Sequence, residues 1–236
     1  SMKKTGYFAL VTFALVIAFS ACKKEDPPIV DLGYGYFPVK VGSWIEYQVD
    51  SMWRNDNAVP EPLWDRLSYR MLERVIEEYT DDEGRPAHRI HRFIKNDQDE
   101  WVIRDVWTGT HNSSAAERTE ENERRLKLSF PTRNNRSWDM NVYNTDEELE
   151  VNYKEVDTPY ALNGMAFDST LVVRNKVGPN AVNKRNFDER YVKNIGMVQK
   201  YWEESNTQTT YPIGLPPQVR VEGFRLDMEM VAYGQD

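Results

Sequence analysis

The sequence predicts an all-β protein in which an antiparallel sheet curls into a partly open barrel or a sandwich. Aromatic residues make up 12% of the chain, with 7 Trp and 13 Tyr, and large flat side chains suit pleated, half-buried surfaces. Short apolar runs alternate with polar residues along much of the chain. Gly, Pro and Asn separate these runs at regular spacing, which predicts about eleven strands joined by turns.

The first predicted strand follows a turn at Gly42. Ile45, Tyr47 and Val49 alternate with polar residues, as expected of a strand that buries one face. Residues 55–62 contain prolines and asparagines and should form the loop that ends this strand.

Residues 67–79 are compatible with two structures. Their apolar side chains fall on a helical stripe, and the segment taken alone would be a helix. The acidic turn at residues 81–84, followed by β-rich residues 90–94 and 101–107, instead favours a meander of three strands. We therefore predict a strand at 67–79.

The chain between the two halves is polar. Residues 111–125 place glutamates beside arginines, and we expect a long surface excursion with a helical turn there. The second half returns to short strands, with a hairpin turn at residues 194–196. The strands predicted in this half are 148–156, 167–177, 186–192, 197–203 and 224–230.

The N-terminal segment has the features of an export signal. Two lysines precede an apolar run at residues 7–19, which has the length of a signal-peptide core and is too short to cross a bilayer. Ser20 and Ala21 then lead to Cys22, the only cysteine. This arrangement resembles the bacterial lipobox, in which the cysteine is alkylated by diacylglycerol and, after cleavage, acylated by a fatty acid such as palmitate. Phe19 stands where leucine is usual, and the alternative is a plain secretory peptide.

These features predict the organisation and location of the chain. We expect a lipoprotein signal peptide at 1–21, the lipidated Cys22 with a flexible tether at 22–35, and a single β-rich domain at 36–236. The basic and then acidic residues 23–28 resemble the signal that exports Bacteroidetes lipoproteins to the cell surface, although a solvated tether would look the same. The expected location is the outer membrane, through the lipid anchor. A net charge of −8 argues against nucleic-acid partners.

Several phrases of the sequence are shared with one family. They are Tyr36-Phe37-Pro38 with Gly42 and Trp44, Gly84-Arg85-Pro86, Leu128-Ser129-Phe130-Pro131 with Trp138, and Glu189-Arg190-Tyr191 followed by Gly196-Met197-Val198. With them the chain resembles an uncharacterised family of Bacteroidetes outer-membrane lipoproteins that carries a Tyr-Phe-Pro-Leu, Gly, Trp signature, with Val39 in place of the leucine. The resemblance supplies no catalytic or binding residues. Its β-rich architecture is akin to the half barrels of periplasmic lipoprotein carriers, an analogy of fold only.

The sequence offers little for catalysis. It contains no Gly-x-Ser-x-Gly elbow, phosphate loop, Rossmann fingerprint or zinc-helix motif. His88 and His91 are three residues apart, which in a strand puts them on opposite faces, where they cannot share a metal. The acidic runs 81–83 and 97–100 lack the full ligand order of a calcium loop. We therefore expect no metal and no cofactor, and a non-enzyme is favoured over an enzyme.

The tryptophans give the candidate ligand site. Trp44 and Trp138 follow turns and are expected in the core. Trp53, Trp64 and Trp107 lie near predicted strand ends or loops, where an aromatic ring can stack on a sugar or line an apolar cleft, and they are our candidate ligand-binding residues.

Three functions are compatible with these observations. The first is a non-enzymatic envelope lipoprotein that binds a ligand, such as a glycan, or another envelope protein. The second is a lipid or lipoprotein carrier, which needs an apolar cavity. The third is an envelope glycan hydrolase, which needs two carboxylates at catalytic separation that the sequence does not identify.

Overall fold

Twelve antiparallel strands form one sheet in the computed structural model, which describes residues 30–178, 180 and 182–236. The strands are β1 (Ser43–Asn55), β2 (Leu63–Thr80), β3 (Pro86–Lys95), β4 (Trp101–His111), β5 (Ala115–Glu120), β6 (Glu123–Ser129), β7 (Ser137–Asp139), β8 (Glu150–Leu162), β9 (Met165–Asn175), β10 (Asn183–Val192), β11 (Gly196–Thr210) and β12 (Gln218–Gln235). All belong to the unit Leu32–Asp236.

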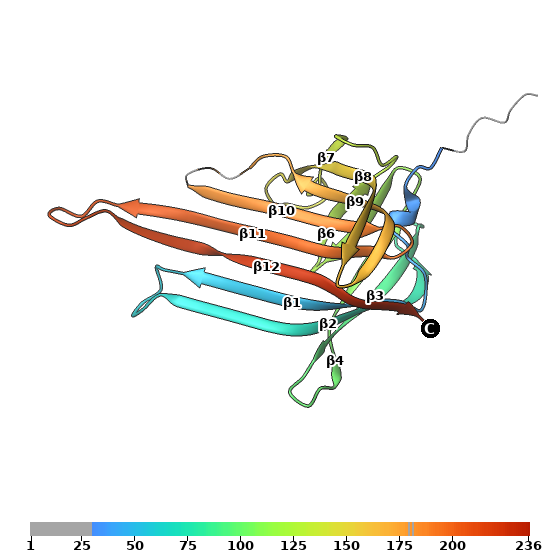
Figure 1. Cartoon of the computed structure of the whole chain (residues 1–236), viewed down its shortest axis with the longest axis horizontal. Coiled ribbons are helices and arrows are strands. Elements are labelled where there is room, and N and C mark those ends of the chain that lie inside the picture. Colours follow the sequence, from blue (N-terminus) through green and yellow to red (C-terminus); the bar gives the residue numbers. More distant parts are fainter. Residues whose placement is uncertain (1–29, 179, 181) are drawn as a thin grey trace, which may run out of the picture. The chain divides into compact units, whose positions relative to one another are not determined.

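The sheet consists of two meanders joined by the first and last strands. Strands β1 to β6 pair in sequence, as do β7 to β12, and β1 pairs with β12 (Figure 1). The sheet curls so that its edge strands β6 and β7 approach each other. Leu126 N–H donates to Met140 O at 2.9 Å, and Trp138 Nε1 donates to Leu126 O at 2.9 Å. The result is a nearly closed barrel with one unsealed seam, which confirms the predicted fold class.

The ambiguous segment at 67–79 is a strand, as predicted, and lies within β2. Met71 and Val75 are buried, and the register with β1 pairs Met71 with Tyr47, on the same face of the sheet. The register with β3 shifts between Val75 and Glu77, so Ile76 occupies a bulge. The bulge breaks the repeat of two after Val75, and before it Leu72 is buried on the opposite face of the sheet from Met71, so the apolar spacing resembles that of a helix.

The prediction for residues 111–125 was wrong. The segment contains β5 and the start of β6, with no helical turn, and several of its charged side chains are buried. Glu120 and Arg125 are among them. These strands could not be predicted from alternating polar and apolar residues, because the side chains that point into the barrel here are themselves charged.

The predicted strands of the second half are present, and most extend further than predicted. The predicted hairpin turn joins β10 to β11, with Asn194 at a positive φ of 66°. The core is formed by inward side chains from both meanders, including Tyr47, Met71, Leu128, Tyr153, Leu171, Phe187, Tyr191, Val198 and Met230.

The segment before β1 covers one end of the barrel. The short 3-10 helix η1 (Tyr34–Tyr36) leads into Phe37, and Tyr36 and Phe37 are both buried. The Tyr36 hydroxyl donates to Asp157 Oδ1 at 2.7 Å, and the β10–β11 turn donates a backbone hydrogen bond of 2.7 Å to this segment. Phe37 lines a cavity of only about 50 Å³ at this closed end.

The predicted signal peptide and the predicted lipidation site Cys22 lie outside the described residues. Within the described part of the chain, no helix has both the length and the hydrophobicity needed to span a membrane.

Candidate functional site

The candidate site is a cavity of about 440 Å³ at the end of the barrel opposite η1. The residues that line it come from β1, β2, β3, β4, the β5–β6 hairpin, β11 and β12. Its apolar and aromatic walls are formed by Met52, Trp53, Leu67, Tyr69, Trp107, Trp202, Phe224, Leu226 and Met228. A volume of this size is within the range of small-molecule sites.

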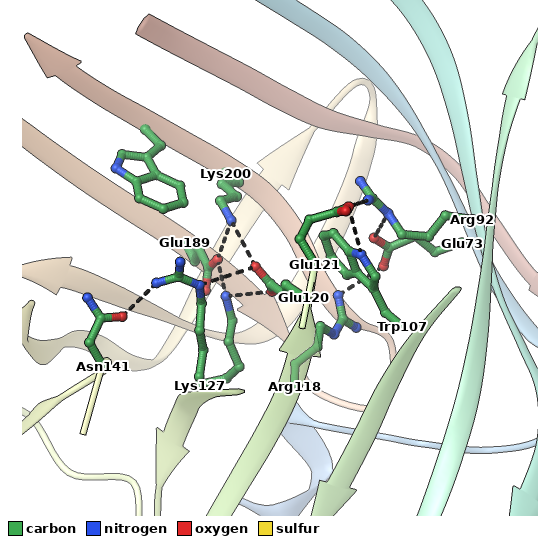
Figure 2. Close-up of polar contacts among 12 residues, drawn as sticks. Glu73, Arg92, Trp107, Arg118, Glu120, Glu121, Lys127, Asn141, Glu189 and Lys200 are labelled. Atoms are coloured by element: carbon green, nitrogen blue, oxygen red, sulfur yellow. Dashed lines mark hydrogen bonds and ion pairs between the residues drawn. The ribbon is translucent and has the colours of Figure 1, made fainter. Parts of the chain in front are cut away.

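The floor of this cavity is charged. Inward side chains of six strands form a charged layer across the barrel, consisting of Glu73, Arg92, Arg118, Glu120, Arg125, Lys127, Glu189 and Lys200 (Figure 2). Glu73 and Arg118 also line the small closed-end cavity, whereas Arg92, Glu120 and Lys200 line the open one. The charged layer therefore separates the two ends of the barrel.

One half of the charged layer is centred on Glu189, which is fully buried. Lys127 Nζ lies 2.6 Å and Lys200 Nζ lies 3.2 Å from Glu189 Oε1. The Tyr191 hydroxyl donates to Glu189 Oε2 at 2.7 Å. Lys127 Nζ also lies 3.2 Å from Glu120 Oε1, so the two lysines connect two carboxylates, and Figure 2 shows these groups converging.

The other half of the charged layer is centred on Glu73. Arg118 donates to Glu73 Oε2 at 3.0 Å, and Arg92 Nε lies 3.2 Å from Glu73 Oε1. The Arg92 guanidinium also lies 3.5 Å from the centre of the Trp107 ring and 3.1 Å from the Asp105 carboxylate. Arg92 therefore holds Trp107 in place at the cavity wall through a cation–π contact.

The two lysines set the ionisation of the buried carboxyls. Burial alone raises the pKa of Glu120 and of Glu189, but the positive charges of Lys127 and Lys200 outweigh it and lower the pKa of both below the ordinary value. Burial lowers the pKa of Lys200, and the two carboxylates oppose that effect only in part. Both glutamates are thus ionised at neutral pH.

The structure brings together two of the three candidate tryptophans. Trp53 on β1 and Trp107 on β4 both line the open cavity. Trp64 on β2 does not line it, and its ring instead stacks with the Arg54 guanidinium at 4.4 Å. Of the expected core residues, Trp138 is buried, whereas Trp44 is half-buried.

Sequence reasoning missed most of the site. Trp202 lines the cavity and stacks edge-on with Phe224, their ring centres 5.5 Å apart. The alternation of Phe224 and Leu226 with charged residues could have indicated this wall, because it marks one inward face. The floor gave no such signal, since Glu120 and Arg125 lie in a run that has the composition of a solvated loop.

His88 and His91 both lie on β3, where His88 is buried and His91 is half-buried. Among the residues that the structure describes, no three His, Cys, Asp or Glu side chains cluster as ligands for a metal ion. No protein-family model and no curated protein matches this sequence. The function has to be argued from the cavity itself.

Proposed function

We propose that this chain is an outer-membrane lipoprotein, anchored through Cys22, whose barrel binds a small amphiphilic ligand without catalysing a reaction. The observation that carries the binding function is the open cavity, with apolar and aromatic walls above a charged floor. Buried ion pairs often add nothing to stability, and replacing them with apolar side chains is often neutral or favourable. A charged floor at the base of an otherwise apolar cavity is therefore better explained by recognition of a polar group than by folding.

The position of the charges orients the ligand. A polar head group would enter first and meet Arg92, Glu120 and Lys200, which supply both donors and acceptors. An apolar or aromatic body would then lie against Trp202 and Leu226 nearer the mouth. This arrangement suits a compact amphiphile with a head group that both donates and accepts hydrogen bonds.

The hydrolase hypothesis gains no support from this floor. A glycoside hydrolase needs one carboxylic acid that is protonated at working pH, with a raised pKa. The pKa of Glu120 and that of Glu189 are both shifted in the opposite direction by Lys127 and Lys200. A carrier of lipids is the second candidate, and the apolar residues around the cavity mouth favour it.

Blocking the cavity tests the binding function. Ser51 faces the cavity from β1 and pairs with Leu67 on β2. Ser68, the residue after Leu67, is exposed and does not line the cavity. We expect Ser51→Trp to weaken the binding of the aromatic sulfonate 1-anilinonaphthalene-8-sulfonate by about tenfold, or about 1.4 kcal/mol, in a fluorescence titration. Ser68→Trp should bind the probe as the unaltered protein does.

Equal affinity in the two variants would show that the probe does not use the cavity and would contradict the proposal. The carrier candidate is tested separately by mixing the protein with vesicles that contain a fluorescent phospholipid. A carrier should remove the phospholipid from the vesicles, and Ser51→Trp should abolish the removal. Probe binding without lipid removal would favour the non-carrier function.

A further inference from the structure

The hairpin of β11 and β12 projects beyond the rest of the sheet (Figure 1). The pairing of β11 with β12 continues to Thr210 and Gln218, but β10 stops pairing with β11 at Asn206 and β1 stops pairing with β12 at Glu222. Among the described residues, the last part of the hairpin is thus a ribbon of two strands without a further neighbour. Such a ribbon is marginally stable in water by itself.

The tip of this ribbon is uncharged and apolar. No Asp, Glu, Lys or Arg occurs in residues 205–219, although these types make up 29% of the chain. Ile213 at the tip has a relative exposure of 103%, and Tyr211 has one of 76%. Leu215 and Val219 are exposed as well. An apolar surface at the end of a projection is costly in water and calls for an occupant.

The backbone of the tip is poor in free donors. Pro212, Pro216 and Pro217 have no N–H group, and Leu215 N–H donates to Pro212 O at 3.2 Å. Burying a polar group without a partner is costly, so a loop with few donors loses less when its apolar side chains settle at the boundary between head groups and acyl chains. A protein partner would impose no such requirement, because its own carbonyls could accept from the loop.

We propose that residues 211–217 insert into the surface of a lipid bilayer. The side chains of Ile213 and Leu215 would reach the boundary between head groups and acyl chains, while the loop backbone and the Tyr211 ring would lie among the head groups, the depth that amphipathic aromatic rings prefer. Because the tip lacks lysine and arginine, insertion should depend on apolar burial and not on anionic lipid or low salt. The site is distinct from the cavity and does not depend on the ligand proposed above.

The test places a fluorescent amino acid, sensitive to its environment, at position 213 of the full chain. The protein is added to phosphatidylcholine vesicles in which some lipids carry a spin label on the acyl chain. We expect the lipid spin label to quench the probe at 213, equally at low and high salt, and to leave a matched probe at position 82 unquenched. Asp82 is an exposed residue of the turn that joins β2 to β3. This turn lies at one end of the sheet, whereas the tip and the β1–β2 loop lie at the other end. The probe reports on residue 213 itself, so the result does not depend on lipidation of Cys22.

A second variant tests the cause of the insertion. With the probe moved to position 215, Ile213→Asp should abolish quenching, because a charge at the tip would have to enter the bilayer. An unquenched probe at 213 would overturn the proposal and leave a protein surface as the occupant. Quenching that survives Ile213→Asp would also overturn it, since apolar burial would then not be the driving force.

Discussion

Lys127 carries a buried charge on which the stability of the barrel should depend. It is buried and contacts two buried carboxylates, Glu120 and Glu189. We expect Lys127→Met to lower the free energy of unfolding by about 3–5 kcal/mol, because it leaves these negative charges short of a buried partner. The measurement is equilibrium unfolding in urea.

Lys184 provides the matched control. Its ammonium lies 2.8 Å from Glu203, but the side chain is 45% exposed and water screens the pair. Lys184→Met should therefore cost less than about 1 kcal/mol. Similar losses in the two variants would show that Lys127 contributes no more than a surface charge does.

At the same scale, the sequence predicted the apolar part of the site better than the polar part. Trp53 and Trp107 could be proposed because an aromatic ring at a predicted strand end can face a cleft, although Trp64, chosen for the same reason, stacks with Arg54 outside the cavity. Lys127 and Lys200 could not, because a lysine in a strand normally faces water and nothing local shows that its face is the inward one. Lys200 lies opposite Glu189 in the β10–β11 hairpin, but only the curling of the sheet brings Lys127 on β6 within reach of the same carboxylate.

Among the elements, the seam between β6 and β7 is the weakest junction of the sheet. The ladder is missing there, and Trp138 replaces part of it by donating to Leu126 O at 2.9 Å. Trp138→Phe keeps an aromatic ring against Tyr153 but leaves the Leu126 carbonyl without this donor. We expect a loss of about 1–3 kcal/mol and faster hydrogen exchange of the Leu126 amide, measured by NMR or mass spectrometry.

The half-buried Trp101, at the start of β4, provides the control. Trp101→Phe should leave exchange of the Leu126 amide unchanged. If Trp138→Phe also leaves it unchanged, the indole does not hold the seam and the backbone hydrogen bond to Met140 is sufficient.

The accuracy of the element predictions depended on whether one face of the strand is apolar. In β1, Tyr47 and Val49 are buried, and the alternation that predicted this strand reflects that face. In β5, the inward positions include Arg118 and Glu120, so a strand had the composition of a polar loop. The projecting part of β11 and β12 was missed for a different reason, since its uncharged residues carry turn signals at Pro212 and Pro216.

At the scale of the whole molecule, pairing of the first and last strands determines the shape of the sheet. The register of β1 with β12 runs from Ser43 opposite Gln235 to Asn55 opposite Glu222. The sequence predicted the meander of β2 to β4 and the β10–β11 hairpin from local turns, but it carries no local signal for a pair separated by nearly the whole chain. The fold class was therefore predictable, whereas the single sheet with its seam at β6 and β7 was not.

The last prediction concerns the location of the whole molecule and follows from the proposed anchor at Cys22. We expect Cys22→Ser to move the protein from the membrane fraction to the soluble fraction after cell lysis and centrifugation. Each buried methylene of an acyl chain contributes about 0.8 kcal/mol, so a cysteine with several chains is held durably. The proposed β11–β12 tip offers only a few side chains, and even a single myristoyl chain binds membranes only marginally. Mass spectrometry of the unaltered protein should find the lipid on Cys22. A variant that stays in the membrane fraction, or a bare thiol on the mature protein, would show that some other element holds the barrel at the envelope.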